Sequence, residues 1–394
     1  MAETFKQLKN YDDKFNILLL LHVAMIVIGL GAAFYMEHHG HIVTGMNNQV
    51  VWGLPHVFAV FLIVSASGAL NLASASSVFS KLDYKRFARL SAILAIALLI
   101  GGLVVLLLDL GRPDRLIVAM TYYNFKSIFA WNIILYTGFI TIVGIYLWTM
   151  MDKTVTKYNK YAGWAAFIWR LILTTGTGSI FGFLVAREAY DAAIMAPLFI
   201  SSSFVYGMAF TIWVIITMCQ ATGQRLLTPG VSEKLRVLMI IFLAAMLYFT
   251  AVHHLTNLYA AEHTGVERFI LWSGNVFTWL FWGGHVLIGA VLPMLILSNP
   301  ERGASHFGLI SSSVMMIIGG LSHIYVIIVG GQSYPLSLFP GYETSSSFQD
   351  GQFAHYMPSM PELLLGLAGI SIAMFMTGFA MKLLPFLPTA VKEQ

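Results

Sequence analysis

Ten long apolar runs constrain the fold of this 394-residue chain more than any other feature of its sequence. They occupy residues 16–36, 55–79, 88–110, 127–150, 161–184, 198–220, 236–260, 269–297, 307–330 and 361–384. A helix of about 20 apolar residues crosses a bilayer core of about 30 Å, and each run meets or approaches that length. The runs are continuously apolar, whereas strands of a membrane barrel alternate over about 10 residues. The sequence therefore predicts an all-α integral membrane protein with ten transmembrane helices.

The composition supports the class of integral membrane proteins and argues against several functions. Only 10% of the residues are charged and 58% are hydrophobic, which is typical of integral membrane proteins. Cys219 is the only cysteine, so the chain cannot supply the roughly four thiolates of an iron-sulfur cluster. No CxxCH motif offers covalent haem attachment, and no Gly-rich loop with a Lys favours an ATPase. The net charge of +4 reflects membrane topology and does not indicate nucleic-acid binding.

The distribution of positive charge predicts orientation, because loops rich in Lys and Arg tend to stay in the cytoplasm. With the N-terminus inside, 16 of the 22 Lys and Arg residues fall on inside segments and five on outside segments. We therefore expect both termini to be cytoplasmic in a multi-pass protein of a bacterial or archaeal inner membrane. The mixed-charge head MAETFKQLKNYDDK does not resemble a removable signal, so the first run is expected to remain as an anchor.

A weak internal repeat predicts two four-helix bundles. PHVFAVFLIVSASGA opens the second run and PLFISSSFVYGMA opens the sixth, each reaching Ser and Gly a few turns after a Pro. Small residues at such positions favour close helix packing in membranes. The expected organisation is an N-terminal head and first helix at 1–45, a first bundle at 46–190 and a second bundle at 191–330. A long outside loop and the last helix, 331–394, complete the chain.

The motif DLGRPDR, residues 109–115, places charge on the outside, against the trend that fixes the topology. Asp109 ends an apolar helix, where the negative end of the helix dipole disfavours a carboxylate by about 0.3 to 1 kcal/mol. Gly111 and Pro113 end the helix, so Arg112 can fold back towards Asp109. An ordinary capped helix end explains the motif as well. The functional interpretation is an acid and an Arg that face a ligand, with Asp114 and Arg115 in water.

Further polar residues at the outside level could donate hydrogen bonds to that ligand or exchange protons with it. The candidates are His56, Tyr122, Asn124, Arg187, His254 and Glu362. Each also has a structural interpretation, as an interface residue, part of an aromatic belt, a solvated loop or a helix cap. His253 and His254 are adjacent, so they point about 100° apart and cannot both face one ligand. The loop 331–360 is long enough to dock a partner or cover a site.

Other histidines could hold a metal or a haem. EHHGH, residues 37–41, offers metal ligands in the first outside loop, but surface histidines without a metal explain it better. His285 and His323 are a possible ligand pair for one b-type haem, although no helix has the two spaced histidines that two stacked haems require. We predict no metal site.

Several motifs occur in the order found in one known family. They are WGLP at 52–55, an S-x-S-G helix, DLGRP at 109–113, NFKS at 124–127 and YMPSMPE at 356–362. This pattern resembles the NrfD and polysulfide reductase C-subunit family of quinone-reactive membrane subunits. Within it, HVFAVFLIVSASGALN and DLGRPDRLIVAMTYYNFKSIFAWNI are most similar to the ten-helix subunits of DsrMKJOP complexes of sulfur metabolism.

The resemblance implies a function and a site. It implies a quinone pocket at the outside end of one bundle, with menaquinone or ubiquinone as exchangeable substrate and no haem or iron-sulfur cluster bound by this chain. It implies a periplasmic ferredoxin-like iron-sulfur partner, together with haem c, haem b membrane and cytoplasmic iron-sulfur subunits of the same complex. It assigns the catalytic pair to Asp109 and Arg112, and a quinone contact to Glu362. The alternatives are a secondary transporter and a b-type haem cytochrome.

Overall fold

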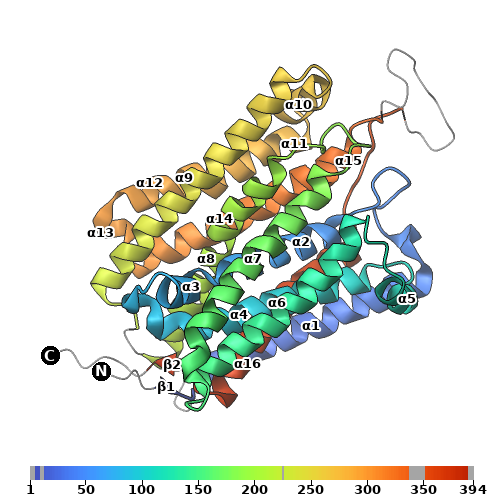
Figure 1. Cartoon of the computed structure of the whole chain (residues 1–394). Coiled ribbons are helices and arrows are strands. Elements are labelled where there is room, and N and C mark those ends of the chain that lie inside the picture. The colour runs from blue at the N-terminus through green and yellow to red at the C-terminus, as the bar shows by residue number, and fades with distance from the viewer. Residues whose placement is uncertain (1–4, 9–12, 224–225, 337–350, 389–394) are drawn as a thin grey trace.

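The computed structural model describes residues 5–8, 13–223, 226–336 and 351–388, which form a bundle of long helices (Figure 1). The long helices are α1 (Asp13–His39), α2 (Leu54–Ala69) with α3 (Asn71–Ser77), α4 (Ala88–Leu108), α6 (Ile128–Met151), α7 (Asn159–Gly182), α8 (Met195–Thr222), α9 (Pro229–Tyr259), α11 (Val276–Trp279) continued by the π-helix η5 (Leu280–Val291) and α12 (Leu292–Ser298), α14 (His306–Tyr325) continued by the π-helix η6 (Val326–Gly330) and α15 (Gly331–Ser333), and α16 (Met360–Leu383). The short elements are η1 (His41–Val43), η2 (Leu82–Phe87), η3 (Pro113–Arg115), α5 (Leu116–Thr121), η4 (Thr156–Tyr158), α10 (Thr264–Leu271), α13 (Pro300–Gly303), β1 (Phe5–Lys6) and β2 (Leu387–Pro388).

The helical runs predicted from the sequence are present in the structure. Within the described ranges, nine helices are long and apolar enough to cross a membrane. The remaining predicted run, 161–184, coincides with α7, which has 24 residues but is more polar than the nine. Its composition includes Arg170 and several Thr and Gly residues. The chain is therefore an all-helical, multi-pass membrane protein.

Two of the predicted runs, 269–297 and 55–79, are interrupted in the structure. The run 269–297 was expected to be a single helix, but α10 ends at Leu271 and α11 begins at Val276. Gly274 between them has a φ of 67°, which glycine adopts without strain. The Asn275 side chain accepts a hydrogen bond from the Thr278 N–H at 2.9 Å and so caps the new helix. This local turn chemistry, hidden inside an apolar stretch, separates the two helices.

The two chain ends meet at one end of the bundle. Phe5 pairs with Pro388 and Lys6 with Leu387 in the antiparallel ladder of β1 and β2. We call this the terminal end, and we call the opposite end, where α1 finishes and α2 begins, the distal end (Figure 1). α1 packs along α16, and α16 packs against α2 and α4. α6 and α7 pack side by side, α8 packs against α2, α7, α9 and α14, and η5 packs against α14.

Two glycines bring α2 and α8 into backbone contact. A Cβ on Gly68 would overlap the carbonyl of Ser203, and a Cβ on Gly207 would overlap the backbone at Gly68 and Ala69. Only glycine allows an approach this close, as in other tight helix crossings in membranes. The close packing expected from the two Ser-and-Gly segments is confirmed, because these segments meet each other at the centre of the molecule.

Arg170 supports a break in the neighbouring helix. The predicted run 55–79 forms two helices, because α2 ends at Ala69 and α3 starts at Asn71. Arg170 is buried, and its Nη1 donates to the Ser67 carbonyl at 3.1 Å and to the Asn71 Oδ1 at 2.7 Å. The last carbonyls of a helix lack partners within it, and a cation at the negative helix end is favourable. Arg170 therefore caps α2 in the interior of the helix bundle.

We predict that Arg170→Met lowers the thermal unfolding midpoint of the purified protein in detergent. The substitution removes the Arg170 donor from the Asn71 amide oxygen and one of two donors from the Ser67 carbonyl, which keeps the Leu70 N–H. A buried group left unsatisfied costs about 1–3 kcal/mol. Arg115→Met is the control, because Arg115 is exposed in the loop after α4. Equal midpoints for the two variants would show that Arg170 does not cap α2.

Candidate functional site

His56 and Asp109 form a buried pair at the distal end. The His56 Nδ1 lies 2.8 Å from the Asp109 Oδ2. His56 lies in the first turn of α2 and Asp109 directly follows α4, so the ends of two neighbouring helices position the pair. The Asp109 side chain is 1% exposed, whereas the His56 side chain is 18% exposed. The pair thus joins a buried carboxylate to an imidazole that reaches the surface.

One oxygen of this pair lacks a hydrogen-bond partner among the described residues. This oxygen is the Asp109 Oδ1, which is buried. Buried polar atoms are rarely left unpaired, so this oxygen marks a place for a proton, a water or a ligand hydroxyl. An ionised Asp109 fixes the proton on the His56 Nδ1, which leaves the Nε2 as the other hydrogen-bonding atom of the ring.

An aromatic cluster borders one face of the His56 imidazole through Trp52. The Trp52 ring stacks on it, with centroids 5.9 Å apart and an interplanar angle of 18°. Phe129 of α6 and Phe181 of α7 pack against Trp52, with ring centroids 5.9 and 6.1 Å away. An imidazole and a carboxylate next to apolar aromatic rings suit a flat, largely apolar ligand that carries a few polar atoms.

The segment before α2 is held by residues from distant parts of the chain. The Gln332 Oε1 accepts hydrogen bonds from the Val51 and Trp52 N–H groups, both at 3.0 Å, and its Nε2 donates to the Trp52 carbonyl at 3.0 Å. Arg187, predicted as a ligand contact, donates to the carbonyls of Gln332 and Gln49, both at 2.9 Å. α15 and the loop after α7 therefore fix the segment that carries Trp52.

Glu362 and Tyr356 hold other backbone groups of the segment before α2. The Tyr356 hydroxyl donates to the Glu362 Oε1 and accepts from the Leu54 N–H, each at 2.6 Å. The Glu362 Oε2 accepts from the N–H groups of Gly45 at 2.8 Å and Ser359 at 2.7 Å. Burial and the neighbouring Glu362 carboxylate raise the Tyr356 pKa, so the hydroxyl remains a donor. Glu362, predicted to contact the ligand, is fully buried and holds the backbone in this structure.

The expected pairing of Arg112 with Asp109 is wrong. Arg112 binds Asp114 instead, with Nε to Oδ1 at 2.9 Å and Nη2 to Oδ2 at 2.8 Å. Both side chains are more than half exposed, and this hydrogen bond lowers the pKa of the Asp114 carboxyl. The guanidinium reaches the nearer carboxylate in a fork geometry that needs no burial, whereas His56 already occupies Asp109.

The other predicted residues of this loop lie at the surface. Tyr122 and Asn124 are exposed, and the Asn124 Oδ1 accepts from the Lys126 N–H at 3.1 Å. α5, in the same loop, has no buried residue (Figure 1). In the loop predicted at 331–360, residues 337–350 lie outside the described residues. Its last part reaches the distal end, where the Ala354 N–H donates to the Ser333 carbonyl at 2.9 Å.

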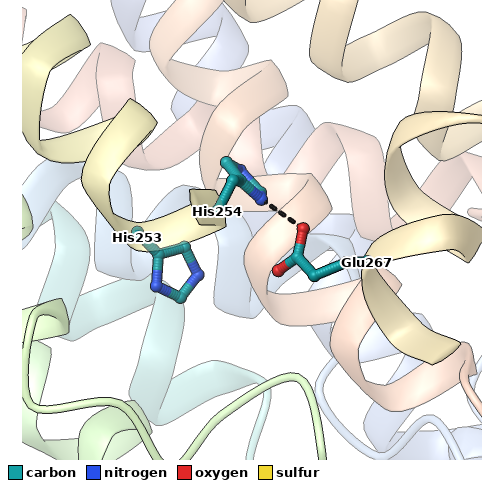
Figure 2. Close-up of side chains that lie close together, drawn as sticks. All are labelled: His253, His254 and Glu267. Atoms are coloured by element: carbon teal, nitrogen blue, oxygen red, sulfur yellow. Dashed lines mark hydrogen bonds and ion pairs between the residues drawn. The ribbon is translucent and has the colours of Figure 1, made fainter. Parts of the chain in front are cut away.

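A second histidine and carboxylate pair lies in the later half of the chain. The His254 Nδ1 is 2.6 Å from the Glu267 Oε2, and the Asn257 Nδ2 donates to the Glu267 Oε1 at 2.9 Å. Figure 2 shows His254 bonded to Glu267 while the His253 ring lies apart from that bond. His254, predicted as a ligand contact, thus belongs to a cluster built by α9 and α10.

The geometry of this cluster is that of a hydrogen-bonded network. The possible metal-ligand atoms of His253, His254 and Glu267, one for each residue, all lie within 4.8 Å of one another. Ligand atoms around a tetrahedral zinc lie about 3.4 Å apart, because each bond is about 2.0–2.1 Å. The His254 and Glu267 atoms already bind each other, so a metal would have to separate them.

His285 and His323 form a stacked pair deeper in the same half. Their ring centroids are 3.8 Å apart at an angle of 13°, and both rings are buried. A haem ligated by two histidines needs iron and a porphyrin between the two rings, and a face-to-face stack at this distance leaves no such space. The residues present therefore do not fit the predicted alternative of a haem held by His285 and His323.

Several residues of these clusters were missed in the sequence. Tyr356, Gln332 and Trp52 act through main-chain groups or ring stacking, for which the sequence has no pattern. Glu267 offered a signal, since it is an acid in a short apolar stretch soon after two histidines. Its hydrogen bond to His254 spans only 13 residues.

Comparison with known families shows to which family the chain belongs. A family model described as polysulphide reductase, NrfD, matches residues 42–335, which is most of the chain. The chain belongs to the NrfD family. The matched region runs from the segment before α2 to α15 and includes His56, Asp109, His254 and Glu267. α1 and α16 lie outside it, and so does Glu362.

Three NrfD-like relatives align along most of their length. The Hdr-like menaquinol oxidoreductase integral membrane subunit of Archaeoglobus fulgidus is 28% identical, covering 100% of this chain and 99% of that protein. A membrane subunit assigned to a dimethyl sulfoxide reductase of Halobacterium salinarum is 27% identical, with 92% and 89% covered. The menaquinone reductase integral membrane subunit of Nitratidesulfovibrio vulgaris is 23% identical, with 91% and 89% covered.

We predict that Tyr356→Phe loosens the segment that carries His56. The variant loses the donor to the Glu362 Oε1 and the acceptor for the Leu54 N–H, and a hydrogen bond to a charged group contributes about 1.5–3 kcal/mol. Backbone hydrogen exchange measured by mass spectrometry is expected to accelerate in residues 45–56. Tyr259→Phe is the control, because Tyr259 is 95% exposed. Unchanged exchange in Tyr356→Phe would show that the Tyr356 hydroxyl does not hold this segment.

Proposed function

We propose that this NrfD-family protein is a quinone-binding membrane subunit that exchanges electrons between the quinone pool and a partner subunit. The observation that carries the proposal is the His56–Asp109 pair, a proton-exchanging dyad among aromatic rings. Relatives that align along nearly the whole chain include membrane subunits of a menaquinol oxidoreductase and a menaquinone reductase. The substrate is accordingly menaquinone or ubiquinone.

The dyad provides what quinone chemistry requires of the protein. Oxidation of a quinol gives two electrons and two protons, and reduction of a quinone takes them up. The His56 Nε2 is the atom that binds a carbonyl oxygen of the quinone, or a hydroxyl of the quinol, and gives or takes a proton there. Asp109 orients the imidazole through the Nδ1 and compensates the charge when the ring is protonated. The unpaired Asp109 Oδ1 can hold a further proton.

The electrons leave or arrive through a partner. With a single cysteine, the chain does not ligate an iron-sulfur cluster of its own. The partner we propose is a periplasmic ferredoxin-like iron-sulfur subunit that docks on the distal end near α5 and the loop 331–360. The similarity to subunits of DsrMKJOP complexes extends the proposal to haem c, haem b and cytoplasmic iron-sulfur subunits and to sulfur metabolism.

The other residues predicted to contact the quinone do not bind it directly in the deep site of this proposal. Arg112, Tyr122 and Asn124 lie on the exposed loop after Asp109, so they reach a quinone or the partner only at the mouth of the site. Arg112 must leave Asp114 to bind a quinone. Arg187 and Glu362 hold the segment before α2 through hydrogen bonds to its backbone.

We predict that Asp109→Asn and His56→Phe each lower quinol-linked electron transfer by about a hundredfold or more, because positioned acid–base groups contribute about 10²–10⁴-fold. Turnover is measured with the assembled complex and a soluble quinol analogue. Asp114→Asn is the matched control, since it removes a carboxylate from the same motif at an exposed position. Arg112→Ala is expected to have a smaller effect than Asp109→Asn.

The outcome that rejects the site is equally concrete. If complexes that contain Asp109→Asn or His56→Phe assemble and turn over quinol at the unmodified rate, the dyad is not the quinone site. If Asp114→Asn is as damaging as Asp109→Asn, the motif acts through its exposed charge.

We further propose that ten helices cross the membrane, with both termini in the cytoplasm. The pairing of β1 with β2 supports placing both ends on one side of the membrane, and an even number of crossings then makes α7 the tenth. In this topology, residues 46–190 and 191–330 are two four-helix bundles. A cysteine introduced at Lys153 should react with a membrane-impermeant maleimide only from the cytoplasmic side, and one at Ser273 only from the periplasmic side. The reverse labelling pattern would invert the proposed orientation.

The transporter alternative has less support. Secondary transporters break helices at matching places of two repeats. α2 is broken from α3 at Leu70, whereas α8, which the repeat places opposite α2, is continuous from Met195 to Thr222.

A further inference from the structure

A cavity of about 90 Å³ lies between α1, α8 and α16. It is near the terminal end, because its lining comes from the first turns of α1 and from the last turns of α8 and α16. Most of the lining side chains are apolar, among them Leu18 of α1, Trp213 of α8 and Met374 of α16. His22 is the one ionisable residue of the lining. The cavity is therefore an apolar space at the depth of one membrane leaflet.

The cavity follows a boundary between two sets of helices. α1 packs along α16, and α16 packs against α2 and α4. Among the described residues, neither α1 nor α16 packs closely against α8, so side chains alone line the space between them. α8 belongs to the region that the NrfD family model matches, whereas α1 and α16 lie outside it. The cavity thus separates the two outer helices from the family core at this level.

The cavity reaches the surface that faces lipid. Its lining residues Leu18, Trp213 and Thr217 are only half-buried, and Ile17 and Leu21 beside them are 55% and 62% exposed. Protein interiors are close-packed, and the lining of an apolar void loses contacts. Apolar cavities stay free of water and take up apolar molecules. In a bilayer the apolar molecule at hand is a lipid hydrocarbon chain, which matches such a lining.

Two lysines lie at the end of this cavity nearest the water. Lys14 is in the first turn of α1, next to the lining residue Phe15, and Lys382 is in the last turn of α16, next to the lining residue Met381. The Lys382 Nζ donates to the Asn16 Oδ1 at 3.0 Å, which brings the two helix ends together. Basic pockets between membrane helices on the cytoplasmic side bind anionic lipid head groups. The charge at this end therefore complements a phosphate.

The other charged groups of this end leave the balance positive. Asp13 precedes Lys14, and its place in the first turn of α1 suits the positive end of the helix dipole. Adjacent helical residues point about 100° apart, so Asp13 and Lys14 face different directions. Arg89 of α4 donates to the Pro385 carbonyl just beyond Lys382, at 3.0 Å. Three cations thus stand against one acid around the last turn of α16 and the first turn of α1.

We propose that this cavity binds one anionic phospholipid, with a hydrocarbon chain between α1, α8 and α16 and the phosphate at Lys14 and Lys382. We call the cavity and the two lysines the lipid slot. In the proposed topology the lipid belongs to the cytoplasmic leaflet, and it joins the outer helices α1 and α16 to α8. The slot lies at the terminal end, whereas the His56–Asp109 dyad lies at the distal end, so the slot needs no quinone to operate.

Native mass spectrometry of the purified, delipidated full chain tests the slot by titration with phosphatidylglycerol and with phosphatidylcholine of the same acyl chains. We expect one phosphatidylglycerol to bind about tenfold or more tighter than phosphatidylcholine, since a lysine near an anionic head group contributes about fivefold. Thr217→Phe places a ring in the cavity and is expected to weaken phosphatidylglycerol binding at least tenfold. Lys14→Gln combined with Lys382→Gln is expected to reduce it to the affinity for phosphatidylcholine.

Matched controls separate loss of the slot from a damaged fold. Thr137→Phe makes the same substitution at an exposed position of α6 and should leave phosphatidylglycerol binding unchanged. Lys153→Gln combined with Lys160→Gln removes two exposed positive charges from the same end and should also leave it unchanged. The unfolding midpoint of each variant without lipid reports whether the bundle is intact. If Thr217→Phe does not fold, Leu18→Trp fills the cavity from α1 instead.

The outcomes that reject the slot are specific. It is rejected if the folded cavity-filling variant binds phosphatidylglycerol as tightly as the unmodified chain, or if phosphatidylcholine binds equally well. Menaquinone that displaces the bound phosphatidylglycerol in direct competition would assign the cavity to a quinone. A dimer that Thr217→Phe abolishes would assign this face to a second copy of the chain. Because the titration contains no quinone, its result does not depend on the His56–Asp109 dyad.

Discussion

The hydrogen bond between His56 and Asp109 is the interaction around which the distal end is organised. A carboxylate at the negative end of an apolar helix needs a partner, and here the partner is an imidazole from the start of another helix. The segment that delivers His56 has little regular structure, so its backbone is held by Gln332, Arg187, Tyr356 and Glu362. These residues come from α15, from the loop after α7 and from around the start of α16. Residues from three separate regions of the chain thus fix the position of one imidazole.

The same chemistry occurs twice, on unrelated elements. In both pairs a side chain that is 1% exposed supplies the carboxylate, and an imidazole that is 12–18% exposed binds it through the Nδ1. In the first pair a helix end and a helix start meet across 53 residues, whereas in the second α9 and α10 are consecutive. The first pair faces aromatic rings, and the second opens on a small polar-lined cavity.

The helices and the need of Asp109 for a partner could be predicted from the sequence, because long apolar runs and a charge at a helix end are local signals. The partner of Asp109 could not, since the fork of Arg112 and Asp114 competes within the same loop and His56 lies 53 residues away. Arg187 and Glu362 were identified as polar residues at the correct end. Their partners are backbone groups, which no sequence pattern distinguishes from ligand atoms. The stack of His285 on His323 depends on the crossing of α14 with η5, which only the packed structure specifies.

The most direct test of the quinone site is an experimental structure of the complex with a menaquinol analogue bound. We predict that one hydroxyl oxygen of the quinol lies within hydrogen-bond distance of the His56 Nε2 and that the quinol ring packs against Trp52. The Asp109 carboxylate stays bonded to the Nδ1 on the other side of the imidazole. A quinol ring seated elsewhere, for example against His254, with His56 and Asp109 free of it, would contradict this assignment.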